Sequence, residues 1–159
     1  MAPQSQRGVT LLEMMAALVI LSLLLTLVHL SLDGITPRWQ LRASAHQVEG
    51  IVRWAQNAAA IQGRPVQIMY DVPQGSFWAR IGEATYSLHT LPGSIHFERV
   101  RFANGDEVMR DVAAVRAYPD GTLDFHTVVL GGPDNERATL TFERLTGELT
   151  YVEESGDIR

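Results

Sequence analysis

The N-terminal part of the chain contains an apolar run that constrains the whole fold. The run covers residues 9–32, and its stretch Met14–Val28 has no charged residue and only two polar ones, Ser22 and Thr26. As an α-helix it would rise about 36 Å, enough to cross a hydrocarbon layer of about 30 Å. Apolar residues occupy every face, so the run is not the amphipathic helix of a globular core. It predicts a membrane-crossing helix.

The residues that flank the run indicate its orientation. The preceding segment carries the initiator amine and Arg7, which favours a cytoplasmic N-terminus and an exported body beyond Asp33. A secretory signal peptide has a shorter apolar stretch and a small-residue cleavage site, and no such site follows Leu32. A plain membrane anchor fits the length but leaves Glu13, inside the apolar run, unexplained.

Glu13 is costly in this position and needs a partner, because a carboxylate at membrane depth costs up to a few kcal/mol. Cleavage of the chain after Gly8 would create a positively charged amine at Val9, four residues before Glu13. Two opposite unit charges about 4 Å apart attract by about 4 kcal/mol at an effective dielectric constant near 20. We expect Glu13 to neutralise such an amine on a neighbouring subunit and so to select the register of helices during assembly.

The segment Arg7–Met15, with the sequence RGVTLLEMM ahead of an apolar run, resembles the N-terminus of type IV pilins and type II secretion pseudopilins. In that family a prepilin peptidase cuts after the glycine and methylates the new N-terminal residue, and the glutamate guides subunit docking. The resemblance implies leader cleavage between Gly8 and Val9, N-methylation of Val9 and subunit docking by Glu13. The first mature residue of the family is usually phenylalanine, whereas here it is valine.

The rest of the chain predicts one amphipathic helix and then a series of short strands. Pro37 suits a helix restart, and apolar residues recur at helical spacing from Leu41 to Ala59, which predicts a helix over about 38–62 that ends at Gly63. Trp54, which lies in this helix near Ile51 and Ala58, is expected to be packed. Short alternating segments predict strands at residues 66–70, 76–81, 84–88, 94–102, 113–118, 123–130, 138–142 and 148–152.

These elements predict an α+β fold. A long N-terminal transmembrane helix would continue into the amphipathic helix, which would pack on an antiparallel β-sandwich over about residues 65–152. With the resemblance, the chain divides into three parts: a leader at 1–8, a transmembrane assembly helix at 9–32 and a periplasmic pseudopilin domain at 33–159.

Further segments narrow the resemblance to the H-type minor pseudopilins. They are AAIQGRPV at residues 59–66, YPDGT at 118–122 and LTFERLTGEL at 140–149, although minor pilins of type IV pili share this plan. The resemblance implies a single-pass protein of the bacterial inner membrane, at or near the tip of the periplasmic pseudopilus that helps export folded proteins. Its implied partners are major and minor pseudopilins, prepilin peptidase, the inner-membrane assembly platform and the lipid bilayer, with secreted substrates or the outer-membrane channel as further candidates.

Composition and charge exclude some classes of binding partner and some kinds of catalytic or metal site. The chain has 13 basic and 18 acidic residues, a net charge of −5 and no cysteine. An acidic chain argues against a nucleic-acid partner, including DNA uptake by a minor pilin of a type IV pilus, the nearest alternative function. The absence of cysteine excludes disulfides, thiolate metal sites and cysteine nucleophiles. We expect no cofactor.

A membrane-tethered periplasmic enzyme is the alternative from another class. Its best candidate groups are the pairs His96/Glu98 and Asp124/His126, each of which would share one face of a strand. The acidic loops 105–107 and 134–136 are weaker candidates for calcium. No HExxH or GxSxG motif is present, and a solvated strand face explains the pairs equally well. We therefore expect no enzyme activity, no catalytic residue and no metal site.

Overall fold

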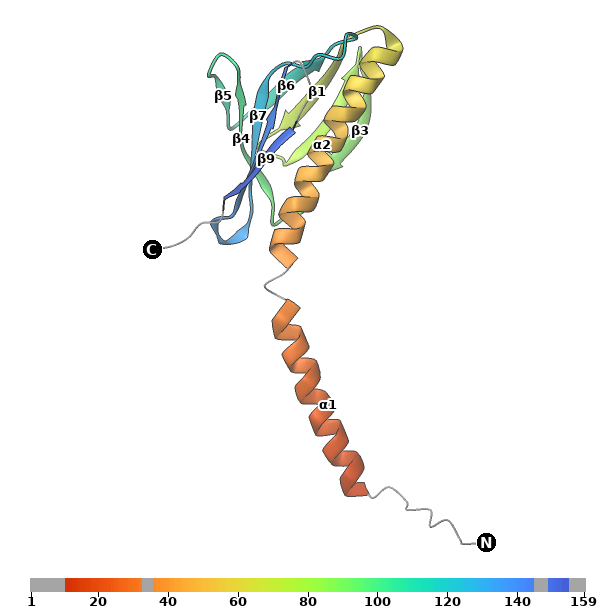
Figure 1. The fold of residues 1–159 in the computed structure, drawn as a ribbon, viewed down its shortest axis with the longest axis vertical. Coiled ribbons are helices and arrows are strands. Elements are labelled where there is room, and N and C mark those ends of the chain that lie inside the picture. The colour runs from red at the N-terminus through yellow and green to blue at the C-terminus, as the bar shows by residue number, and fades with distance from the viewer. Residues whose placement is uncertain (1–10, 33–35, 145–148, 155–159) are drawn as a thin grey trace, which may run out of the picture. The chain divides into compact units, whose positions relative to one another are not determined.

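The computed structural model describes residues 11–32, 36–144 and 149–154, and the chain forms two units, Met1–Thr36 and Pro37–Arg159 (Figure 1). The elements in chain order are α1 Leu11–Leu32, α2 Thr36–Gln62, β1 Val66–Asp71, β2 Ser76–Ile81, β3 Ala84–Thr90, β4 His96–Phe102, β5 Glu107–Val108, β6 Val112–Ala117, β7 His126–Gly131, the 3-10 turn η1 Pro133–Asn135, β8 Arg137–Phe142 and β9 Leu149–Glu154.

The first unit contains α1. Its large apolar side chains between Leu11 and Leu23 are 55–82% exposed. Helix α1 is described as far as Leu32, and α2 begins at Thr36, next to Pro37, close to the predicted helix start. Within the described ranges, none of the helices meets the combined length and hydropathy expected of a membrane span.

The second unit is built around α2, whose apolar stripe is buried as predicted. Leu41, Val48 and Ala59 on this stripe are fully buried. The helix ends at Gln62 because Gly63 adopts a φ of 64°, the left-handed conformation that closes many helices. Trp54 is only partly packed: its residue is 37% exposed, and its ring contacts that of Tyr86 with centroids 5.9 Å apart. Its position is at the edge of the stripe, beside the exposed strand β3.

The strands form two antiparallel sheets, which confirms the predicted α+β class with an antiparallel sandwich. Four strands pair in the order β3-β2-β1-β6 and five in the order β5-β4-β7-β8-β9. Two details differ from the sequence prediction. The strand expected from Leu123 begins only at His126, because Leu123 makes a single bridge to Ala117 and the backbone of Asp124 bonds to Arg116. The short strand β5 was not predicted.

One hydrophobic cluster contains residues of α2 and of both sheets, and Figure 1 shows α2 running along the strands. Aromatic rings cross between the sheets: Phe97 of β4 lies 5.8 Å from Tyr70 of β1 and 5.9 Å from Phe77 of β2, both in edge-on geometry. In β1 and β8 every second residue is buried, so each strand presents one face to this core and the other outward. The outward faces are where functional side chains can lie.

Candidate functional site

The predicted assembly residues lie at the N-terminal end of the chain. Gly8 and Val9 fall outside the described residues, so cleavage and methylation stay predictions. Glu13 lies in the first turn of α1 and its side chain is exposed among exposed leucines and methionines. A carboxylate in the first turn also lies near the positive end of the helix dipole, which stabilises its charge. The exposed position of Glu13 is compatible with docking to another subunit, and this role stays a prediction.

The exposed surface of α1 requires a covering environment. Burial of apolar surface is worth about 25 cal/mol per Å². Because the described part of α1 is apolar on all faces and exposed on all of them, that energy is gained only when lipid or other chains surround the helix. The only acidic residue of α1 is Glu13, so a charged partner would fix how such helices align.

The first candidate catalytic pair, His96 and Glu98, does come together. Both side chains lie over Gly131 of β7, where a Cβ atom would come within 2.7 Å of the His96 ring and 3.1 Å of Glu98 Oε1. Glu98 also accepts from Arg137, whose Nε lies 2.8 Å from Oε1 and 3.1 Å from Oε2. The carboxylate is therefore held by a guanidinium, and Gly131 provides the space for the group.

The second pair, Asp124 and His126, does not form as predicted. His126 is fully buried, whereas the Asp124 carboxylate accepts from the Tyr118 hydroxyl at 3.1 Å and from the backbone N–H of Arg116 at 3.1 Å. The two residues meet only through the backbone, because His126 Nδ1 lies 2.8 Å from the carbonyl oxygen of Asp124. The expectation of a shared strand face was wrong because β7 begins at His126.

His126 instead belongs to the core. If its Nδ1–H donates to the Asp124 carbonyl, Nε2 accepts from the Tyr70 hydroxyl at 3.2 Å, so both ring nitrogens are satisfied in the neutral form. The ring stacks on Phe142 with centroids 4.7 Å apart. Burial lowers the pKa of His126 to about 4 and raises the pKa of Tyr70. The His126 ring and the Tyr70 hydroxyl are therefore both uncharged at neutral pH.

The two acidic loops engage partners of their own. Glu107 binds Arg101, with Oε1 2.6 Å from the arginine Nε, and Asp106 accepts from the side chain of Asn104 at 2.6 Å. Glu136 is only 8% exposed and accepts from Arg38 Nε at 2.7 Å. Across the described parts of the chain, no three His, Cys, Asp or Glu side chains are placed to hold a metal ion together.

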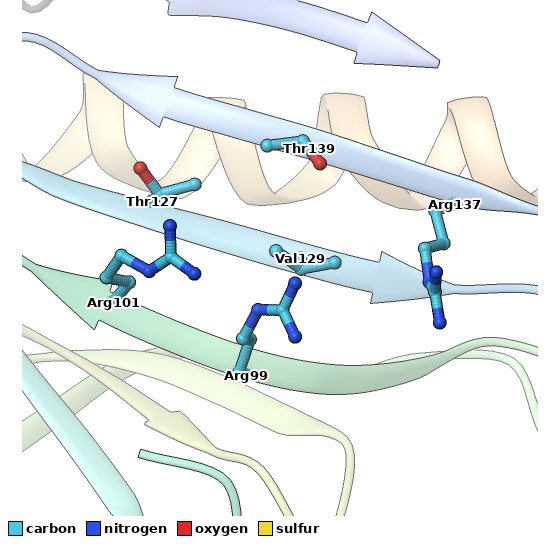
Figure 2. Close-up of a pocket in the computed structure, with 6 residues that line it drawn as sticks. All are labelled: Arg99, Arg101, Thr127, Val129, Arg137 and Thr139. Atoms are coloured by element: carbon cyan, nitrogen blue, oxygen red, sulfur yellow. The ribbon is translucent and has the colours of Figure 1, made fainter. Parts of the chain in front are cut away.

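Sequence reasoning missed a polar pocket on the outer face of the five-stranded sheet. Its volume is about 190 Å³. Figure 2 shows its lining, which comes from three neighbouring strands and which we call the arginine pocket: Arg99, Arg101, Thr127, Val129, Arg137 and Thr139. In β4, Arg99 and Arg101 flank the buried Val100, so alternation indicates that both arginines face outward. The contribution of Arg137 and Thr139 from β8 could not be predicted, because it depends on strand pairing.

Comparisons with known proteins agree with this architecture. Residues 3–28 match the family model of the prokaryotic N-terminal methylation motif. Among solved structures, the fold is similar to the minor pseudopilin EpsH from the type 2 secretion system of Vibrio cholerae, with a TM-score of 0.50 and 11% sequence identity. The match covers 75% of this chain and 99% of that one. A search of curated protein sequences finds no match.

The two matches concern different kinds of likeness. The motif match rests on sequence and lies entirely in the N-terminal 28 residues. The structural match, at its low identity, is a likeness of fold. The chain therefore joins a prokaryotic N-terminal methylation motif at residues 3–28 to a fold similar to that of a minor pseudopilin.

Proposed function

We propose that this chain is a non-enzymatic minor pseudopilin of a type II secretion system, at or near the tip of its periplasmic pseudopilus. The observation that supports this best is the combination of a methylation motif at residues 3–28 with a minor pseudopilin fold. Neither feature alone separates the function from that of a simple membrane anchor or a soluble β-domain. The single-pass inner-membrane location and the periplasmic body follow from the same proposal.

The mechanism begins with removal of residues 1–8 by prepilin peptidase and methylation of Val9. The apolar helix that remains is held in the inner membrane until the assembly platform moves it into the fibre. There, the exposed apolar surface of α1 is covered by the helices of other pseudopilins, and Glu13 pairs with the N-terminal amine of a neighbour. The β-domain stays on the outside, where it can meet secreted substrates or the outer-membrane channel.

Cleavage is tested by the mass of the chain purified from cells that contain prepilin peptidase. We expect a chain that starts at Val9 with one added methyl group. The matched variant Gly8→Ala retains the charged leader and the apolar run, but we expect it to keep residues 1–8. A wild-type chain that still begins at Met1 in peptidase-positive cells would contradict the proposal.

Docking by Glu13 is tested with Glu13→Gln, which removes the charge and keeps the size of the side chain. We expect normal membrane insertion and processing but a loss of cross-links to other pseudopilins and a large fall in secretion. Glu143→Gln, an exposed acid of the β-domain, is the control and should behave as wild type. Equal secretion by the Glu13 variant and wild type would argue against this role.

A minor pilin of a type IV pilus remains the alternative, because the methylation motif does not name the fibre. The two functions differ in their partners, so purification of the cross-linked complex followed by identification of its subunits separates them. Pseudopilins of a secretion system support the proposal, whereas pilins of a surface pilus replace it with the alternative.

A further inference from the structure

The arginine pocket lies on the side of the five-stranded sheet that faces away from the core. Val100, Val128 and Leu140 point inward and are fully buried. The residues between them on β4, β7 and β8 therefore point outward, and Figure 2 shows the side chains of Arg99 and Arg101 extending from β4 toward β7. All the residues that line the pocket therefore belong to strands of the sheet, and none belongs to a loop.

The arginines of the pocket differ in how their side chains are paired. Arg101 is paired with Glu107, with Nε 2.6 Å from Oε1, and Arg137 is paired with Glu98 at 2.8 Å. The Nε of Arg99 lies 4.0 Å from Glu107 Oε1, beyond hydrogen-bond distance, and this buried atom has no hydrogen-bond partner among the described residues. Arg99 is thus the arginine of the pocket whose Nε is a buried donor without an acceptor among the described residues.

An unmatched donor at a pocket indicates which ligand would fit. A buried N–H without an acceptor costs about 1–3 kcal/mol, and a carboxylate oxygen is a strong acceptor for a guanidinium. The Thr127 hydroxyl lies 3.3 Å from that of Thr141, and Val129, only 4% exposed, forms an apolar floor. The pocket thus offers the guanidinium of Arg99, hydroxyl groups at its side and an apolar base.

Size and overall charge limit the ligand further. A volume of about 190 Å³ is smaller than the 300–1,000 Å³ typical of sites for drug-sized ligands, so a single small group is the appropriate occupant. Long polyanions such as nucleic acid are disfavoured by the net charge of −5 on the whole chain. A single acidic side chain on another protein satisfies both limits.

We propose that the arginine pocket binds one carboxylate, which an aspartate or glutamate of a partner protein presents. The carboxylate accepts from Arg99, whose Nε otherwise lacks an acceptor among the described residues. The chemistry of the pocket is independent of the assignment to a secretion fibre, and it holds whether the partner is another subunit of a fibre or a transported protein.

The test uses the full chain in neutral detergent, labelled with ¹⁵N and observed by NMR at the arginine Nε–H groups. The probe is the peptide acetyl-Gly-Glu-Gly-amide, and acetyl-Gly-Gln-Gly-amide is its uncharged match. We expect a saturable shift of the Arg99 Nε–H signal with the glutamate peptide and none with the glutamine peptide. No shift with either peptide overturns the proposal, and so does an equal or larger shift with inorganic phosphate or a single-stranded oligonucleotide.

Two variants test whether the pocket itself is responsible. Arg99→Gln should weaken binding of the glutamate peptide about tenfold or more, read from the backbone amides of Thr127 and Thr139. Arg80→Gln, an outward arginine of the other sheet, is the control and should bind as wild type. Thr139→Glu supplies the carboxylate from the chain itself, so it should abolish the response while the protein remains folded. Wild-type binding by both pocket variants overturns the proposal.

Discussion

At the scale of single residues, burial changes what a titratable side chain can do. His126 was a candidate for proton transfer in the sequence, but in the structure it lies in the core between Tyr70 and Phe142. Its two ring nitrogens are used in hydrogen bonds of the neutral form. A proton added to Nε2 would turn that acceptor into a donor facing a hydroxyl and would place a charge in an apolar environment.

This burial predicts a loss of stability in acid. The pKa of His126 is about 4 in the folded chain, below the ordinary value of 6.5, so the unfolded chain binds the proton first as the pH falls. The free energy of unfolding should therefore decrease between about pH 6.5 and about pH 4, by up to roughly 1.4 kcal/mol per pH unit.

Denaturant unfolding at a series of pH values measures this dependence. His126→Gln should flatten it in that window, whatever its effect at neutral pH, while His89→Gln, at an exposed histidine, should leave it unchanged. A slope that is the same in wild type and His126→Gln would mean that other groups are responsible for the acid sensitivity.

A second prediction at this scale concerns the pair of Arg38 and Glu136. The carboxylate is almost fully buried, and its Oε2 has no partner among the described residues, so Arg38 supplies the main compensation for its charge. Arg38→Met should lower the unfolding temperature, because an unpaired buried carboxylate remains. Adding Glu136→Gln should restore more than half of the loss. If the double variant is no more stable than Arg38→Met, the unpaired charge is not the cause.

At the scale of elements, α2 is the link between the two sheets, and its ends are determined locally. Its N-terminal half is tied to the five-stranded sheet by Arg42, which binds Glu153 at 3.0 Å. Its C-terminal half is tied to the loop after β6 by Gln56, which donates to the carbonyl of Gly121 at 3.1 Å. The predicted bounds were close to the observed ones because Pro37 and Gly63 act through their own backbone geometry.

Two glycines of this region should respond in opposite ways to alanine. Gly50 lies inside α2 with open space around it, so Gly50→Ala should raise the free energy of unfolding by about 0.5–1 kcal/mol. Gly63 also has open space, but its φ of 64° is unfavourable for alanine, so Gly63→Ala should lower it by about 1 kcal/mol.

The two variants control for each other, since both add one methyl group at an exposed site. Chemical denaturation of each variant gives the sign of the change in the free energy of unfolding. A stabilising Gly63→Ala would show that the helix does not need the left-handed residue at its end.

At the scale of the whole molecule, the chain consists of two units that differ in how much apolar surface they bury. Every buried hydrophobic residue among those described lies between Leu41 and Phe142, inside the unit Pro37–Arg159. The described side chains of α1 in the other unit are exposed. The mean hydrophobic content of 46% therefore combines a helix whose described apolar side chains are exposed with a domain that buries its own core.

This division predicts that a chain starting at Pro37 folds without the first unit. Its far-ultraviolet circular dichroism should show the mixed α+β signal, and its thermal transition should be cooperative with a midpoint within a few degrees of the full chain in detergent. The full chain serves as the control. A truncated chain without a cooperative transition would show that α1 contributes to the folding of the domain.

The sequence by itself determined the features that arise from neighbouring residues. The methylation motif, the apolar run with its single carboxylate, the start of the second helix near Pro37 and its end at Gly63 all depend on residues within a few positions of one another. Most strands were also predictable from alternation, because a strand with one buried face repeats every two residues. The register between strands was not, since it is set by contacts far apart in the chain.

The tertiary structure alone decided which side chains meet. Arg99 and Arg101 of β4 share a pocket with Arg137 of β8 only because β7 pairs with both strands in a particular register. The same pairing moved His126 into the core and left Asp124 outside the strand. Local backbone preferences act within a few residues, whereas the placement of charges and cavities follows from long-range packing that alternation cannot encode.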